Sequence, residues 1–231
     1  MKFLIIQTAF IGDVILATPV IEKLHQFYPE AKIDFILRKG NEDLFKNHPY
    51  LNELIIWDKR KNKFTNLIRI IRTVRRKKYH CVINLHRFAS SGIVTILSGA
   101  THKIGFNKNP FSILFTKIVK HEINTVKGGS KHETKRNLEL INDLGSAVND
   151  HIFTKPKLYP SKEDFNKVSQ YKEQVGSRLP IAIGTAVSKE PHQPFPKNRD
   201  KLTINHQPSF ICIAPVSVWF TKQFPKGKWI E

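Results

Sequence analysis

Short apolar segments alternate with amphipathic ones along the first half of the chain. The apolar segments, residues 3–6, 32–37, 54–57, 81–86 and 102–106, are predicted strands. Their nearly continuous apolar runs are typical of a parallel sheet that helices cover on both faces. Apolar residues recur at helical spacing over residues 14–27, 67–74 and 93–97, and residues 41–47 are predicted to form a short helix. This alternation predicts an α/β domain with a Rossmann-like parallel sheet.

The junction between the first strand and the first helix has the sequence Phe10-Ile11-Gly12-Asp13. Ligands of open α/β sheets bind at the carboxyl ends of strands, so this junction is a candidate site. Gly12 would permit a tight turn, and a helix N-terminus would stabilise the negative charge of Asp13. Position alone leaves two roles open for Asp13, a helix N-cap or a catalytic carboxylate.

The pattern weakens after residue 106. Residues 110–119 are amphipathic and predict no definite element. Ser130 and Glu133 have the spacing of a capping box, ahead of a helix that Gly145 ends. A further helix is expected over residues 164–174, between proline-rich segments that are typical of loops. Residues 210–214 are a predicted buried strand, and residues 225–231 resemble the first turns of a helix.

These segments predict three regions of chain. Residues 1–150 form an N-terminal Rossmann-like domain, residues 151–208 form a linker or divergent segment, and residues 209–231 form the truncated start of a second Rossmann-like domain. About twenty residues cannot bury a core of their own. The chain is therefore expected to be a fragment or to end prematurely.

The charge of the chain is strongly positive, with 38 Lys and Arg against 19 Asp and Glu, a net charge of +19. Such a surface attracts polyanions, which include nucleic acids, anionic lipid headgroups and phosphorylated substrates. The helix predicted around residues 67–74 carries several arginines beside its apolar stripe, and it is interpreted either as a solvated face or as a contact with an anionic membrane. Cys81 and Cys212 lie in apolar runs without CxxC spacing, as expected for reduced core residues of a cytoplasmic protein.

A second candidate site follows the strand predicted at residues 210–214. Ser217, Thr221 and Lys222 precede Pro225, which is suited to the first position of a helix. Hydroxyl groups, a lysine and helix N–H groups together suit a phosphate, although a surface loop in a lysine-rich protein has the same composition. The sequence contains no GxGxxG, Walker A, HExxH or GxSxG motif and no cluster with metal-ligand spacing, so no catalytic metal is expected.

Four segments resemble the glycosyltransferases of family 9, the lipopolysaccharide heptosyltransferases. They are residues 5–19 with Gly12-Asp13, residues 103–106, residues 132–138, and residues 214–217 together with 222–229. The segments follow the family's order over nearly the whole chain. The resemblance implies a GT-B fold, in which two Rossmann-like domains face each other across a cleft. The N-terminal domain would bind the acceptor, and the C-terminal domain would bind the nucleotide-sugar.

The resemblance also implies a role for each candidate residue. Asp13 would act as general base on the acceptor hydroxyl, with inversion at the anomeric carbon. Gly12 would contact the substrate beside it. Lys222 and Ser217 would contact the phosphates of an ADP-heptose-like donor, where a cation stabilises the charge of the departing nucleotide. No metal or other cofactor is needed if these groups perform that work.

The implied function is the transfer of a heptose-like sugar to a phosphorylated lipid A/inner-core glycolipid, by a cytoplasmic protein that is peripheral at the inner face of the cytoplasmic membrane. The family's later donor-binding residues would lie beyond Glu231, so the chain is expected to be a truncated or inactive copy. The alternative is a basic Rossmann-like nucleic-acid-binding module. The sequence lacks a recognisable nucleic-acid-reading motif, and its aromatic residues lie mainly in apolar runs, so no nucleic acid partner is expected.

Overall fold

The computed structural model describes residues 1–60, 62–121, 132–145 and 155–176. The chain divides into two compact units, residues 1–161 and residues 162–231. The predicted domain boundary at residue 150 and the predicted second domain, with Ser217 and Lys222, lie outside the described residues. In the second unit, α6 (Lys162–Gly176) confirms the helix expected over residues 164–174.

One parallel sheet of six strands organises the described part of the first unit, in the order β3-β2-β1-β4-β5-β6. The strands are β1 (Lys2–Ile6), β2 (Lys32–Arg38), β3 (Glu53–Trp57), β4 (Cys81–Asn84), β5 (His102–Phe106) and β6 (Lys117–Val119). The five predicted strands are confirmed. The sequence missed β6, a three-residue edge strand without a buried residue, because such a strand leaves almost no apolar pattern.

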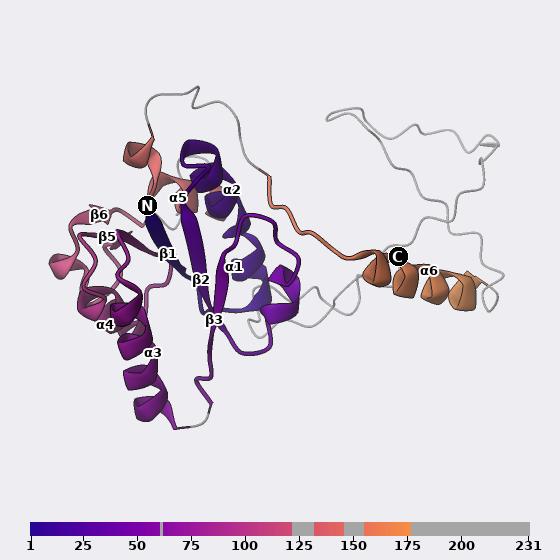
Figure 1. The fold of residues 1–231 in the computed structure, drawn as a ribbon, viewed down its shortest axis with the longest axis horizontal. Coiled ribbons are helices and arrows are strands. Elements are labelled where there is room, and N and C mark those ends of the chain that lie inside the picture. The colour runs from indigo at the N-terminus through magenta and orange to yellow at the C-terminus, as the bar shows by residue number, and fades with distance from the viewer. Residues whose placement is uncertain (61, 122–131, 146–154, 177–231) are drawn as a thin grey trace, which may run out of the picture. The chain divides into compact units, whose positions relative to one another are not determined.

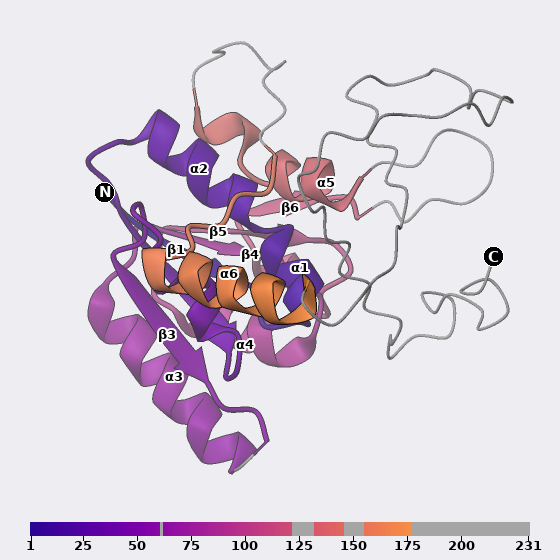
Figure 2. The same cartoon turned by 90° about the vertical axis from the view of Figure 1, so that its right-hand side faces the viewer.

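Helices cover both faces of the sheet (Figure 1). They are α1 (Ile11–Ile15), α2 (Thr18–Phe27) and α5 (Glu133–Glu139) on one face, and α3 (Lys63–Lys77) and α4 (Ala89–Leu97) on the other (Figure 2). Short 3₁₀ helices are η1 (Glu42–Phe45), η2 (Ser112–Leu114) and η3 (Asn142–Leu144). This three-layer arrangement confirms the predicted α/β, Rossmann-like architecture.

Successive residues of the central strand serve the two layers in turn. Phe3 and Ile5 of β1 belong to the core beneath α2 and α5, whereas Leu4 and Ile6 belong to the core beneath α3 and α4. All four side chains are buried. The continuous apolar run therefore reflects a strand with helices on both of its faces.

The single helix predicted over residues 14–27 is two helices. α1 ends at Ile15, and α2 begins at Thr18 with Pro19 in its first turn. A proline lacks the N–H group that would continue the hydrogen-bond ladder, and its ring clashes with the preceding turn. The chain therefore breaks at Leu16 and Ala17, which leaves α1 as a short, separate helix that carries Asp13.

The predicted capping box at Ser130 and Glu133 is wrong. α5 begins at Glu133, so this residue occupies the first helical position rather than the third. The cap is His132, whose Nδ1 accepts a hydrogen bond from the N–H of Thr134 at 3.3 Å. The imidazole nitrogen thus satisfies a free donor of the first turn, the task that the pattern assigned to a serine hydroxyl.

Candidate functional site

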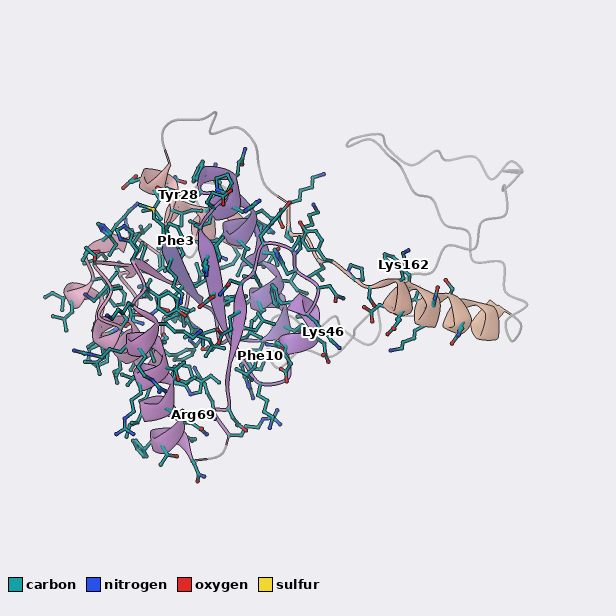
Figure 3. The ribbon with its side chains drawn as sticks, viewed as in Figure 1. Phe3, Phe10, Tyr28, Lys46, Arg69 and Lys162 are labelled. Atoms are coloured by element: carbon teal, nitrogen blue, oxygen red, sulfur yellow. The ribbon has the colours of Figure 1, made fainter. Side chains whose placement is uncertain are left out.

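The carboxyl ends of the strands lie at one edge of the sheet, and the chain leaves that edge in opposite directions after β1 and β4. β1 leads through α1 and α2 to β2 on one side, whereas β4 leads through α4 to β5 on the other. Ligands of open α/β sheets bind at such a switch point. Phe3 lies within the sheet and Phe10 marks this edge (Figure 3).

Asp13 is the third residue of α1, directly above this switch point. The N-cap of α1 is Phe10, and no side chain caps the helix, so the alternative role of Asp13 as an N-cap is wrong. The side chain is partly exposed and makes no hydrogen bond or ion pair with the described residues. The carboxylate is therefore open to a ligand at this edge of the sheet.

Gly12 leaves the surface beside Asp13 bare. It lies inside α1 and has no positive φ, so the predicted tight turn at Gly12 is wrong. The chain instead enters α1 directly from the extended backbone of Phe10. A Cβ at Gly12 would meet no atom within 4 Å. A ligand can therefore approach the backbone closely next to the Asp13 carboxylate.

A hydrogen-bonded chain of three side chains joins the loops at the switch point. Lys59 Nζ, after β3, donates to Thr8 Oγ1, after β1, at 2.7 Å. Thr8 Oγ1 lies 3.1 Å from His86 Nδ1, after β4. Thr8 and His86 are buried. The Thr8 hydroxyl accepts from the Lys59 ammonium, and it is assigned as the donor to Nδ1 of a neutral His86.

The charge states of this chain follow from its burial. Burial, together with the nearby cations of Lys59 and Arg87, lowers the pKa of His86 to about 3, which keeps the imidazole neutral at neutral pH. Burial and Arg38 lower the pKa of Lys59 to about 8. The Lys59 ammonium also lies 4.2 Å from the centroid of the Trp57 ring, a cation–π distance.

Polar side chains of Asn84, Ser91 and Asn109 form hydrogen bonds with the backbone of the loop after β4. Asn109 Nδ2 donates to the carbonyl oxygens of His86 at 3.1 Å and Phe88 at 3.0 Å. Ser91 Oγ donates to the same His86 carbonyl at 3.0 Å, and the His86 N–H donates to Asn84 Oδ1 at 2.9 Å. These bonds fix the backbone of His86, and Thr8 is positioned against it.

The sequence identified part of this edge. Gly12 and Asp13 are where the strand–helix junction predicted them, whereas Ser217 and Lys222 lie outside the described residues, so their approach to Asp13 stays a prediction. Sequence reasoning did not single out Thr8, Lys59 or His86. The available signal was their shared position, since each follows a buried strand and parallel strands end at one edge.

Two properties of the described residues bear on other kinds of site. Nowhere in the described ranges do three His, Cys, Asp or Glu side chains gather in a way that suits a metal ion. The expectation that no metal is needed stays a prediction. Among the same residues, no helix has the length and apolar character to cross a bilayer.

The α/β fold described above matches solved structures of GT-B type. A family 9 glycosyl transferase from Veillonella parvula superposes with a TM-score of 0.63 at 22% identity, covering 80% of this chain and 54% of that one. Escherichia coli heptosyltransferase WaaC with ADP-2-deoxy-2-fluoro heptose superposes with a TM-score of 0.53 at 20% identity, covering 65% of this chain and 51% of that one.

Sequence relatives name the family more narrowly. Lipopolysaccharide heptosyltransferase 3 of Escherichia coli is 29% identical over 140 residues, 59% of this chain and 41% of that protein. Lipopolysaccharide heptosyltransferase 1 of Campylobacter coli is 30% identical over 110 residues, 47% of this chain and 32% of that protein. No family model matches. The resemblance to the lipopolysaccharide heptosyltransferases is confirmed, over less than half the length of these relatives.

Proposed function

We propose that the chain acts in a glycosyltransferase that moves a heptose-like sugar from a nucleotide-sugar onto a glycolipid acceptor of the lipopolysaccharide core, with inversion. The observation that carries the proposal is Asp13, a carboxylate without a partner among the described residues, at the switch point of a family 9 fold. Asp13 does not cap the helix and is partly exposed beside the switch point, so its carboxylate is open to a ligand.

The proposed chemistry begins with the acceptor hydroxyl beside Asp13. The carboxylate accepts the hydroxyl proton while the oxygen attacks the anomeric carbon of the donor from the face opposite the diphosphate. The bond from the anomeric carbon to the diphosphate breaks, and the nucleotide leaves with the electron pair. Lys222 and Ser217 are proposed to stabilise the charge on that leaving group, without a metal ion.

The bare surface at Gly12 supports close approach of the acceptor to Asp13. The hydrogen-bonded chain of Lys59, Thr8 and His86 supports the role of Asp13 in a second way, because it fixes the loop that precedes α1. Thr8 lies five residues before Asp13, and a rigid loop keeps the base within the narrow range of positions that proton transfer requires.

The relatives' names support the choice of substrates. One solved neighbour contains an ADP-heptose analogue, which makes an ADP-heptose-like sugar the proposed donor. The acceptor proposed for this chain is a phosphorylated lipid A/inner-core glycolipid, and the net charge of +19 suits such an anion. The glycolipid places the reaction at the inner face of the cytoplasmic membrane, where the protein would act as a peripheral partner of the anionic surface.

The test compares the chain with its Asp13→Asn variant, which keeps the size of the side chain and removes its basicity. We expect sugar transfer to fall by a factor of about 10² to 10⁴, the usual contribution of a general base. Far-ultraviolet circular dichroism and binding of an acceptor glycan, measured by calorimetry, should be unchanged. Equal turnover of the two proteins would exclude Asp13 as the base, and a product that keeps the anomeric configuration of the donor would exclude single-step inversion.

A further inference from the structure

The solvent side of α3 combines exposed apolar side chains with arginines. We call it the outer face of α3, and it comprises Phe64, Ile68, Arg69, Arg72, Arg75 and Arg76. Phe64 is 82% exposed and Ile68 is 47% exposed. Residues four apart lie on one side of a helix, so Phe64 and Ile68 form a continuous apolar strip. Arg72 follows at the same spacing and places a positive charge at the end of this strip.

The described part of the fold packs against the other side of α3. α3 packs on the sheet through Ile70 and Val74, with Leu67 and Ile71 beside them. Lys77 of α3 contacts the acidic residues Asp34 and Glu53 at the opposite end of the helix from Phe64. No acidic residue occurs in α3 itself. The arginines of the outer face thus present uncompensated positive charge beside exposed apolar surface.

The apolar end of this face lies at the same edge of the sheet as Asp13. β3 ends at Trp57 and α3 begins at Lys63, so only a short loop separates the carboxyl end of β3 from Phe64. In Figures 1 and 2 this end of α3 extends past the strands, and Arg69 lies on the same part of the helix in Figure 3. A surface bound through Phe64 would therefore lie next to the candidate site.

We infer that the outer face of α3 docks the protein on an anionic lipid bilayer, with Phe64 and Ile68 inserted at the boundary of headgroups and acyl chains. The arginines bind the lipid phosphates around them. The inference deepens the proposed function, on which it rests, because the membrane is where a glycolipid acceptor lies. It adds which element docks and which side chains enter the bilayer.

The chemistry of the face favours lipid over nucleic acid. Nucleic-acid surfaces that lack base-edge readout use aromatic rings as stacking platforms between cations. Here the strip pairs one ring with the branched side chain of Ile68, which cannot stack on a base. An amphipathic basic helix with Phe and an aliphatic residue on one line is instead typical of interfacial membrane binding.

The first test removes the apolar strip. The full chain and its Phe64→Ser/Ile68→Ser variant are sedimented with vesicles of phosphatidylglycerol and phosphatidylcholine. We expect the variant to bind about tenfold more weakly, because the inserted carbon groups are lost. The matched control is Ile113→Ser/Leu114→Ser, which removes side chains that are 83% and 57% exposed at η2. Equal binding by the strip variant and the control would overturn the inference.

The second test removes charge. Arg72→Gln/Arg75→Gln should weaken vesicle binding by about 25-fold, at about fivefold per arginine. Lys46→Gln/Lys108→Gln removes the same charge from exposed positions elsewhere and should change binding little. Wild-type binding should fall as salt is raised and should be lost on phosphatidylcholine alone. An equal loss of vesicle binding in the two charge variants would show that the net charge of the protein, not α3, attracts the vesicles, and would overturn docking through α3. Stronger binding of wild type to a single-stranded oligonucleotide than to vesicles would also overturn it.

The vesicle measurements are independent of sugar transfer. Asp13→Asn should bind vesicles as wild type does, and the strip variant should retain Asp13-dependent transfer to a soluble acceptor glycan. Failure of the proposed function with intact vesicle binding therefore differs from failure of docking with intact transfer. Thermal unfolding of each variant, monitored by circular dichroism, distinguishes these two failures from a loss of fold.

Discussion

Asn137 Nδ2 donates a hydrogen bond to the carbonyl oxygen of Leu16, at an N···O distance of 3.1 Å. Leu16 is the C-cap of α1, and the N–H of Val20, four residues further on, donates to the carbonyl of Ala17 instead of that of Leu16. A buried side chain of α5 thus holds the end of the short helix that carries Asp13. Two segments through which the sequence resembles the heptosyltransferases, residues 5–19 and 132–138, meet at this bond.

Replacing Asn137 by alanine should loosen α1 and destabilise the domain. The Leu16 carbonyl would lose its donor in a partly buried setting, at a cost of about 1 kcal/mol in the free energy of unfolding. Urea denaturation of Asn137→Ala measures this cost, and Asn47→Ala, at an exposed position, is the control. Equal stability of the two variants would show that the bond does not hold the helix.

The loop that carries His86 should be sensitive to a single methyl group at Gly92 of α4. A Cβ there would overlap Asn109 Oδ1 and lie 3.0 Å from Phe111 Cδ2. Because Asn109 holds the carbonyls of His86 and Phe88, Gly92→Ala should lower the free energy of unfolding by about 1–3 kcal/mol.

Gly12→Ala, in contrast, should raise the free energy of unfolding. Nothing lies near its Cβ position, and alanine favours a helix over glycine by up to about 1 kcal/mol. Thermal unfolding of Gly92→Ala and Gly12→Ala, side by side with wild type, tests both signs. Destabilisation of Gly12→Ala would mean that the backbone of α1 needs glycine after all.

Lys59 should make stability rise with pH in the alkaline range. Its pKa is about 8 in the folded protein, below the ordinary value of 10.5. Between these values the unfolded chain binds more protons than the folded one, so the free energy of unfolding increases with pH, by at most about 1.4 kcal/mol per pH unit. The increase begins as pH rises through about 8 and is complete above 10.5.

The Lys59→Met variant lacks the titrating group and should lose this rise. Urea denaturation across the range pH 7 to 10.5 measures it as the difference between wild type and variant. Lys46→Met, at an exposed position, should follow the wild-type curve. Parallel curves for wild type and Lys59→Met would contradict the lowered pKa.

The buried carboxylate of Asp34 should be among the most costly side chains to remove from this domain. Its oxygens accept hydrogen bonds from Asn52 Nδ2 and from the Tyr79 hydroxyl, each at 2.6 Å, and Lys77 Nζ lies 3.7 Å away. Burial and Asp34 raise the pKa of Tyr79, so the phenol stays protonated as the donor.

Asp34→Ala leaves these donors facing a cavity and should cost about 3–5 kcal/mol in the free energy of unfolding. Tyr79→Phe removes one bond and should cost about 1.5–3 kcal/mol, since its acceptor is charged. Chemical denaturation compares both with Glu30→Ala, which changes an exposed carboxylate. A cost for Asp34→Ala no larger than that of Glu30→Ala would show that the network contributes nothing.

By itself, the sequence determined the architecture of the sheet. Five of the strands are apolar runs with polar ends, and burial on both faces leaves that pattern in the chain because each strand residue must meet one core or the other. The junction with Gly12 and Asp13 was found because it lies between the first buried strand and the first helical pattern.

Only the tertiary structure decided which side chains meet. Thr8, Lys59 and His86 follow three different strands, and Asn137 reaches Leu16 from the end of the domain, so no local pattern pairs them. The N-cap role of Asp13 and the capping box at Ser130 were wrong because spacing does not say where a helix begins; that depends on which groups find partners. Long-range contacts set these partners, and they depend on the packing of elements far apart in the chain.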